Sequence, residues 1–139
     1  MKVLTATTQQ QVADCYPVMS QLRPHLSAEE FQEKVNQQSK NGYQLVYLTD
    51  NETITAAAGY RIGNSLAWGK FLYIEDLVTD KNSRSKGYGK TLLDWLTNEA
   101  KQKQCDQLHL DSGIQRVDAH RFYERESMKF ASKHFSLML

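Results

Sequence analysis

The feature that most constrains this chain is a stretch of β-forming residues, 73–79, followed by a glycine-containing loop and an amphipathic segment. The loop carries Arg84, Gly87 and Gly89, and this order predicts a strand that leads through a loop into the N-terminus of a helix. The first N–H groups of a helix have no partners within the helix and lie at the positive end of its dipole. Such a loop suits a phosphate or pyrophosphate, so the sequence predicts a chain that binds a phosphorylated cofactor.

The length sets the number of domains. The chain has 139 residues, of which 40% are hydrophobic, which is enough for one domain with a real core and too few for two ordinary domains. Repeats, low-complexity tracts and Pro/Gly-rich linkers are all missing from the sequence. We therefore expect a single domain over residues 1–139.

The charge and the cysteine content argue against several classes of protein. The 17 basic and 16 acidic residues give a formal net charge of +1, so the broad basic surface of a nucleic-acid-binding protein is not expected. Cys15 and Cys105 lie far apart without Cys-x-x-Cys spacing, which argues against a disulfide framework and a zinc site. The sequence shows neither a secretion signal nor a run of about 18 apolar residues, so we expect a cytoplasmic protein without a membrane span.

The N-terminal part of the chain predicts a short strand and then two helices. Thr8 and Gln11 stand at capping-box spacing ahead of a stripe of apolar residues, and Pro24 ends or kinks the helix that they begin. Ser27 and Glu30 repeat the capping-box spacing. Two consecutive helices are therefore expected after the first strand.

The middle of the chain changes to the pattern of strands. Residues 44–49 and 54–62 are rich in β-forming residues and are separated by a polar turn, and a second reversal is expected at Gly63 and Asn64. The run 66–79 contains enough aromatic and branched residues for one long strand. These segments predict an antiparallel meander.

The rest of the chain completes the predicted fold. The segment after the loop has one apolar helical face, and residues 108–110 form a short strand that should lie parallel to the strand ending at Thr79, because strand–helix–strand crossovers join parallel strands. A fourth helix is expected over about 117–126, and a last strand near 130–138. The fold class is α/β, in the sense of an α+β mixed sheet: a central, mostly antiparallel sheet flanked by about four helices.

The glycine loop alone is a weak signal, since short glycine patterns often form nothing more than turns. It is not a Walker A loop, because no Gly-Lys-Ser/Thr ending follows, and it lacks the third glycine of a dinucleotide-binding fingerprint. Its place between a predicted strand and a predicted helix, together with Arg84, Lys86 and Lys90, favours an anion site over a simple turn.

Three segments together carry a specific resemblance. They are residues 74–80 (IEDLVTD), the loop pattern Arg84-x-x-Gly87-x-Gly89, and residues 119–123 (AHRFY). In order and spacing they resemble the Gcn5-related N-acetyltransferase (GNAT) family, most closely its small bacterial members of uncharacterised substrate, and the similarity of element order extends over nearly the whole chain. The resemblance implies the acyl-CoA N-acyltransferase fold. It also implies transfer of an acetyl group from acetyl-coenzyme A to a primary amine, of a small molecule or a protein, by direct attack in a ternary complex.

The resemblance also implies where the cofactor binds. The family's pyrophosphate-binding loop falls on residues 84–90, and its pantetheine-pairing strand falls on residues 77–79, with residues 108–111 as the other wall. The implied cofactor-binding residues are Leu77, Val78, Thr79, Arg84, Ser85, Lys86, Gly87, Tyr88, Gly89, Lys90, Phe122 and Tyr123. Metal is not expected, because the four histidines (His25, His109, His120 and His134) lack metal-ligand spacing.

Two residues are implied as catalytic. Tyr123 matches the family's common tyrosine near the cofactor sulfur, where a phenol with an ordinary pKa near 10 can protonate the departing thiolate; the alternative is a core tyrosine beside Phe122. An attacking amine must lose a proton, and by the same resemblance Glu75 accepts it directly or through water. Because Glu75 and Asp76 are adjacent on a strand, we expect them on opposite faces. The alternative is a solvated acidic pair or a salt-bridged strand end.

Other residues bear on the comparison with the family. Ser127 stands where members usually have a glycine suited to positive φ, and Arg116 stands where many have an asparagine that reaches the cofactor. Ser112 and Cys105 lack a nucleophile motif, so an acyl-enzyme is not expected.

The acceptor is not identified by the sequence. The candidate acceptor-pocket residues are Leu22, Arg23, His25, Tyr60, Trp68, Tyr73 and Phe135. Members of the family are often dimers, and the C-terminal residues 135–139 can supply either a homodimer contact or a buried final strand. Two other functions stay open: a non-catalytic acyl-CoA-binding or regulatory module, and a phosphate- or nucleotide-binding domain that uses the same loop.

Overall fold

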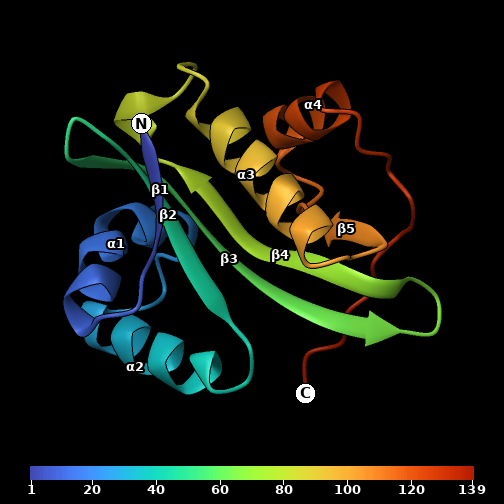
Figure 1. The fold of residues 1–139 in the computed structure, drawn as a ribbon, viewed down its shortest axis with the longest axis horizontal. Coiled ribbons are helices and arrows are strands. Elements are labelled where there is room, and N and C mark those ends of the chain that lie inside the picture. Colours follow the sequence, from blue (N-terminus) through green and yellow to red (C-terminus); the bar gives the residue numbers. More distant parts are fainter. The chain divides into compact units, whose positions relative to one another are not determined.

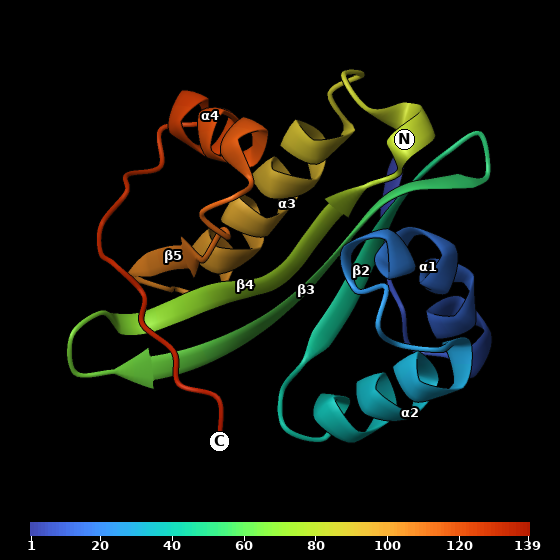
Figure 2. The ribbon, with the colours of Figure 1, turned by 180° about the vertical axis from the view of Figure 1, so that it is seen from behind.

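A single five-stranded sheet, in the order β1-β2-β3-β4-β5, organises the computed structural model, which describes all residues 1–139 (Figure 1). The strands are β1 (Lys2–Thr5), β2 (Gln44–Asp50), β3 (Thr53–Ser65), β4 (Gly69–Thr79) and β5 (Gln107–Leu110). The pairs β1–β2, β2–β3 and β3–β4 are antiparallel, and β5 runs parallel to β4 (Figures 1 and 2). The predicted mixed, mostly antiparallel sheet is confirmed.

The chain divides into two compact units, Met1–His109 and Leu110–Leu139. The helices of the first unit are α1 (Gln9–Leu22), α2 (Ala28–Ser39), the short 3₁₀-helix η1 (Lys81–Ser83) and α3 (Tyr88–Gln102). The second unit contains α4 (Val117–Arg125) and the C-terminal segment that follows it.

Both predicted capping boxes are present. Thr8 Oγ1 accepts from the backbone N–H of Gln11 at 3.1 Å, and Gln11 Oε1 accepts from the backbone N–H of Thr8 at 3.0 Å. Ser27 and Glu30 make the same two bonds at the start of α2, each 3.1 Å long. These side chains replace helical hydrogen-bond partners that the first turn lacks, so α1 and α2 begin where the sequence predicts.

Helices cover both faces of the sheet. In Figures 1 and 2, α1 and α2 lie together on one side of the strands and α3 lies on the other. Ala57 and Val78, which face each other across β3 and β4, belong to the core beneath α1 and α2. Tyr60 lies on the opposite face, where its ring is 6.4 Å from that of Trp95 in α3. The alternation of side chains along a strand separates the two cores.

A β-bulge interrupts the pairing of β3 with β4. Gly59 pairs with Asp76, but the next residue of β3, Tyr60, pairs with Ile74. Glu75 is therefore the extra residue of the bulge. Bulges bend a strand locally and redirect its side chains.

The hairpin between β3 and β4 turns later than predicted. β3 continues to Ser65 and β4 begins at Gly69, so the expected reversal at Gly63 and Asn64 was wrong. Gly63 instead pairs with Phe71, and a side chain at position 63 would press on the Phe71 ring, with its Cβ 2.9 Å from Cζ. This glycine accommodates a neighbouring ring and does not form a turn.

The predicted last strand, near 130–138, is not formed. Strand formation needs a pairing partner as well as β-forming residues, and in this structure residues 128–139 pair with no strand. The rings of Phe130 and Phe135 are exposed, as are Leu137, Met138 and Leu139. The β-forming residues of this segment were insufficient to predict strand pairing.

Candidate functional site

The loop between β4 and α3 ends in a helix start that has no side-chain cap. Gly87 is the N-cap of α3, with φ +82° and ψ 6°, and the space where its Cβ would lie is empty within 4 Å. Ser85 also has a positive φ, +65°. Residues 84–87 are exposed. The backbone thus bends sharply twice and leaves the first turn of α3 open to solvent.

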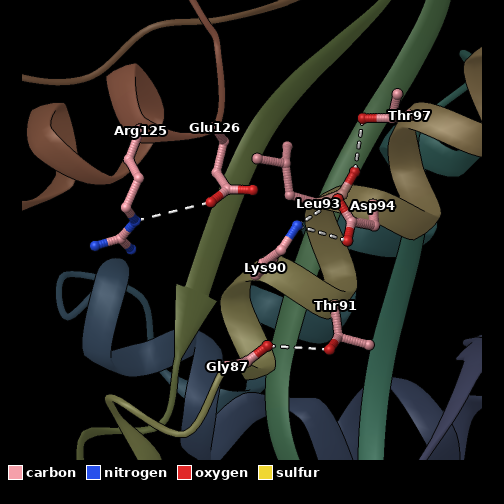
Figure 3. Close-up of polar contacts among 8 residues, drawn as sticks. All are labelled: Gly87, Lys90, Thr91, Leu93, Asp94, Thr97, Arg125 and Glu126. Atoms are coloured by element: carbon pink, nitrogen blue, oxygen red, sulfur yellow. Dashed lines mark hydrogen bonds and ion pairs between the residues drawn. The ribbon is translucent and has the colours of Figure 1, made fainter.

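The charges around this helix start are basic. The first turn of α3 contains no acidic residue, and the exposed side chains of Arg84 and Lys86 precede it. Within α3, Lys90 Nζ lies 3.0 Å from Asp94 Oδ2, and Thr91 Oγ1 donates to the Gly87 carbonyl at 3.0 Å (Figure 3). The helix dipole and the cations together favour an anion at this position.

Two side chains fix the ends of the loop. Gln21, in the last turn of α1, donates to Asp80 Oδ1 at 2.7 Å and accepts from the backbone N–H of Lys81 at 2.9 Å. Tyr88, the first residue of α3, donates its hydroxyl to Asp50 Oδ2 at 2.6 Å, and this hydrogen bond raises the pKa of Tyr88. Both ends of the loop are therefore held by the rest of the first unit.

A second polar cluster surrounds Asp76, on the face of the sheet that carries α1 and α2. Tyr43 donates its hydroxyl to Asp76 Oδ2 at 2.7 Å, and Arg23 Nε donates to Asp76 Oδ1 at 2.9 Å. Only 12% of the Asp76 side chain is exposed. Burial, followed by the charge of Asp76, raises the pKa of Tyr43 well above its ordinary value. Both carboxylate oxygens of Asp76 are engaged.

Glu75 belongs to the same cluster. Its Oε2 lies 2.6 Å from Arg61 Nε, and 33% of its side chain is exposed. Arg61 also donates through Nη2 to Gln38 Oε1 at 2.7 Å, and its guanidinium carbon lies 5.6 Å from the centre of the Tyr43 ring. Glu75 is thus the more accessible of the two carboxylates.

The expectation that Glu75 and Asp76 point to opposite faces is wrong. The bulge at Glu75 breaks the alternation of β4. Asp76 bonds Tyr43 and Arg23, and Glu75 forms an ion pair with Arg61, whose guanidinium lies over the Tyr43 ring. Sequence reasoning also missed Tyr43, Arg61 and Gly59. The available signal was a glycine and an arginine inside one predicted strand, because glycine in a strand interior often marks a bulge or a close approach.

The predicted acceptor residues do not all come together. Arg23 joins the carboxylate cluster, whereas Tyr60 lies on the opposite face and donates to Glu99 Oε2 at 3.3 Å. Trp68 stacks on Tyr73 at 6.3 Å between ring centres, and on His109 at 3.5 Å. Leu22 ends α1 and His25 is exposed in the loop after it, while Phe135 is an exposed residue of the second unit.

The predicted cofactor strand has one buried position. Val78 is buried beneath α1 and α2, while Leu77, opposite Ala58 of β3, and Thr79 are half-buried. These residues lie at the end of β4, just before η1 and the loop. The end of β4 therefore leads directly, through η1, into the loop before α3, and all three lie in the first unit.

Tyr123 lies in α4 of the second unit, with its ring 5.3 Å from that of Phe122. Burial raises the pKa of Tyr123, and the charge of Arg116, the N-cap of α4, opposes this shift. Ser127 follows the helix with φ +70°, in the left-handed region that glycine adopts freely. Arg125 Nε lies 3.8 Å from Glu126 Oε2 (Figure 3).

The structure shows no cluster of three His, Cys, Asp or Glu side chains suited to a metal ion. None of its helices combines the length and apolar character needed to cross a membrane.

Comparison with known proteins gives consistent matches. Residues 8–128 match the family described as the acetyltransferase (GNAT) family. The uncharacterized N-acetyltransferase YhdJ of Bacillus subtilis (strain 168) is 41% identical over 118 residues, which are 84% of this chain and 83% of that protein. The aminoalkylphosphonate N-acetyltransferase of Salmonella typhimurium (strain LT2) is 38% identical over 66 residues, 48% of this chain and 43% of that protein.

Solved structures share the fold. The ribosomal-protein-alanine N-acetyltransferase from Brucella melitensis biovar Abortus 2308 superposes with a TM-score of 0.85 over 100% of both chains. The sequence identity is 12%, so this likeness concerns the fold alone.

Proposed function

This chain belongs to the acetyltransferase (GNAT) family, and from that premise we propose that it transfers the acetyl group of acetyl-coenzyme A to a primary amine. The observation that carries the proposal is the start of α3. It has no side-chain cap, it is preceded by Arg84 and Lys86, and it begins at a glycine with open space around it. This arrangement supports binding of a diphosphate.

The chemistry of the loop fits acetyl-coenzyme A. The backbone N–H groups of residues 87–90 and the side chains of Arg84, Ser85, Lys86 and Lys90 would hold the diphosphate, and Leu77, Val78 and Thr79 would pair with the pantetheine arm. Phe122 and Tyr123 of the second unit are further proposed cofactor-binding residues, by resemblance to the family. When bound, the cofactor supplies an activated acetyl thioester.

Glu75 is the proposed base that accepts the proton of the amine, directly or through water. Its side chain is half-buried, and its carboxylate forms an ion pair with Arg61. Tyr123 is the proposed proton donor to the leaving thiolate. Since burial raises the pKa of Tyr123, its phenol stays protonated at neutral pH and has a proton to give.

The acceptor is a primary amine of a small molecule or a protein. The name of the Salmonella relative puts aminoalkylphosphonates among the first amines to test. The exposed apolar residues at the C-terminus, including Phe135 and Leu137, are the proposed contact of a homodimer.

The test begins with binding. Calorimetry with acetyl-coenzyme A, ATP and NAD should show heat of association for acetyl-coenzyme A, and preference for ATP or NAD would favour a nucleotide-binding domain instead. A panel of aminoalkylphosphonates, polyamines, amino acids and peptides is then screened for thiol release, with mass spectrometry of the acetylated product. Binding without any transfer would favour a non-catalytic acyl-CoA-binding module.

A further inference from the structure

Tyr43 lies at the centre of the polar cluster, immediately before β2. Its side chain is buried, with 5% of the residue exposed, and it belongs to the core beneath α1 and α2. A buried phenol with a single polar atom needs a partner for that atom, and here the partner is Asp76. Two separate series of contacts lead from Tyr43 to Glu75.

The first series starts at the hydroxyl group. Tyr43 donates to one oxygen of Asp76, and Arg23 donates to the other. Arg23 Nη2 also donates to the backbone carbonyl of Glu75 at 3.0 Å. The hydroxyl of Tyr43 therefore stabilises, through Asp76 and Arg23, the backbone of the bulge.

The second series starts at the face of the ring. The Arg61 guanidinium lies over the ring of Tyr43, in a cation–π contact, and its Nε forms an ion pair with the Glu75 carboxylate, 2.6 Å from Oε2. Gln38 holds the far end of the same guanidinium. The ring of Tyr43 therefore supports the side chain of Glu75, as its hydroxyl supports the backbone.

Gly59 leaves room for this arrangement. It pairs with Asp76 across the sheet, and a Cβ at this position would overlap the hydroxyl of Tyr43. Any larger residue at position 59 would displace the phenol from Asp76.

We propose that Tyr43 is a positioning residue for Glu75, acting through Asp76 and Arg23 on the bulge backbone and through Arg61 on the carboxylate. Asp76 then serves this network and is not the base. Both of its oxygens are engaged, and its side chain is 12% exposed against 33% for Glu75. The proposal rests on the proposed function, in which Glu75 accepts the proton of the amine.

The main test removes the hydroxyl of Tyr43 in two backgrounds: the wild type, which has the proposed base Glu75, and Glu75→Gln, which lacks it. Tyr43→Phe should lower kcat about tenfold, because misplacing a catalytic group costs rate even when substrate still binds, and should change KM for acetyl-coenzyme A less than about twofold. In a Glu75→Gln background the same change should alter kcat by less than about twofold, since no base is left to position. An equal loss of kcat in both backgrounds, or no loss in either, would overturn the proposal.

Tyr47→Phe is the matched control. Tyr47 is also buried in the core beneath α1 and α2, and it is not part of the network around Glu75. It should leave kcat within about twofold of wild type. A kcat loss as large as that of Tyr43→Phe would assign the effect to general loosening of the core and overturn the proposal.

Two further measurements separate this proposal from the proposed function. Gly59→Ala, which displaces the phenol, should lower kcat at least as much as Tyr43→Phe, and an unchanged kcat would count against the network. Hydrogen exchange needs no activity: the amides of Glu75 and Asp76 should exchange about tenfold faster in Tyr43→Phe than in Tyr47→Phe. If the wild-type chain acetylates no amine, the proposed function fails, while faster exchange still shows that Tyr43 holds the bulge; unchanged exchange overturns the positioning role itself.

Discussion

The starts of α1 and α2 differ from the start of α3. Thr8 and Ser27 each satisfy backbone N–H groups through complete capping boxes, and α2 adds Glu29 and Glu30 in its first turn. α3 begins at Gly87 with no side-chain cap and no acidic residue in its first turn. Two helices therefore supply their own hydrogen-bond partners, whereas the third leaves donors for another molecule.

α4 shows that the lack of a side-chain cap is not sufficient to identify an anion site. It too begins without a side-chain cap, but its first turn contains Asp118, which supplies negative charge from the chain itself. Only α3 combines a glycine start, neighbouring cations and an absence of acidic residues in the first turn. The combination, and not the missing cap, marks the proposed cofactor site.

The largest expected effect comes from supplying the missing negative charge. Gly87→Asp should raise the Kd for acetyl-coenzyme A about 100-fold, because a carboxylate at this helix start interacts with the same N–H groups and repels the diphosphate. Gly87→Asn has nearly the same shape without the charge and tolerates positive φ, so we expect an increase of only about tenfold. Calorimetry measures both constants, and equal values for Asp and Asn would show that charge at the start of α3 is irrelevant.

Neutralising the loop should have a smaller effect. The double change Arg84→Gln and Lys86→Gln should raise the Kd for acetyl-coenzyme A about tenfold, since two cations are lost while the backbone donors stay. The control is Lys101→Gln with Lys103→Gln, which removes two exposed cations from the other end of α3. A control effect as large as that of the loop change would indicate general attraction to a basic protein instead of a local site.

Changes at the start of a capped helix should alter stability and not the Kd for acetyl-coenzyme A. Thr8→Ala removes the acceptor for the Gln11 N–H and should lower the free energy of unfolding by about 1 kcal/mol without changing the Kd for acetyl-coenzyme A. Thr8→Ser keeps a capping oxygen and should retain most of the stability. Urea unfolding and calorimetry on the same samples check both statements, and a raised Kd in Thr8→Ala would break the contrast with α3.

The same contrast explains what the sequence could predict. Capping boxes are local, so Thr8 with Gln11 and Ser27 with Glu30 locate two helix starts without any knowledge of the fold. The loop was also predictable, because its glycines and cations lie within a few residues of one another. The mixed sheet followed from strand and helix order.

The cluster around Glu75 could not be predicted in this way. It joins residues far apart in the sequence, such as Tyr43 and Asp76, and it depends on a one-residue shift in the pairing of β3 with β4. Nothing in the residues 75–76 alone shows that the alternation of a strand breaks there. The missing last strand has a similar cause, since strand formation depends on a pairing partner as much as on local composition.

The smallest expected effect concerns a helix end that the main chain closes by itself. After α4, the N–H of Met128 bonds the carbonyl of Tyr123 and the N–H of Ser127 bonds that of Glu124, each at 3.0 Å, in the pattern of a Schellman motif. To form this motif Ser127 adopts a positive φ, which strains a serine but which glycine adopts freely. Ser127→Gly should raise the free energy of unfolding by about 0.5 kcal/mol, the relief of left-handed strain being partly offset by the larger entropy of an unfolded glycine. Ser127→Ala keeps the left-handed strain and should not raise the free energy of unfolding. Urea unfolding of the two variants and the wild type measures the difference. If Ser127→Gly is no more stable than the wild type, the helix end tolerates serine without cost.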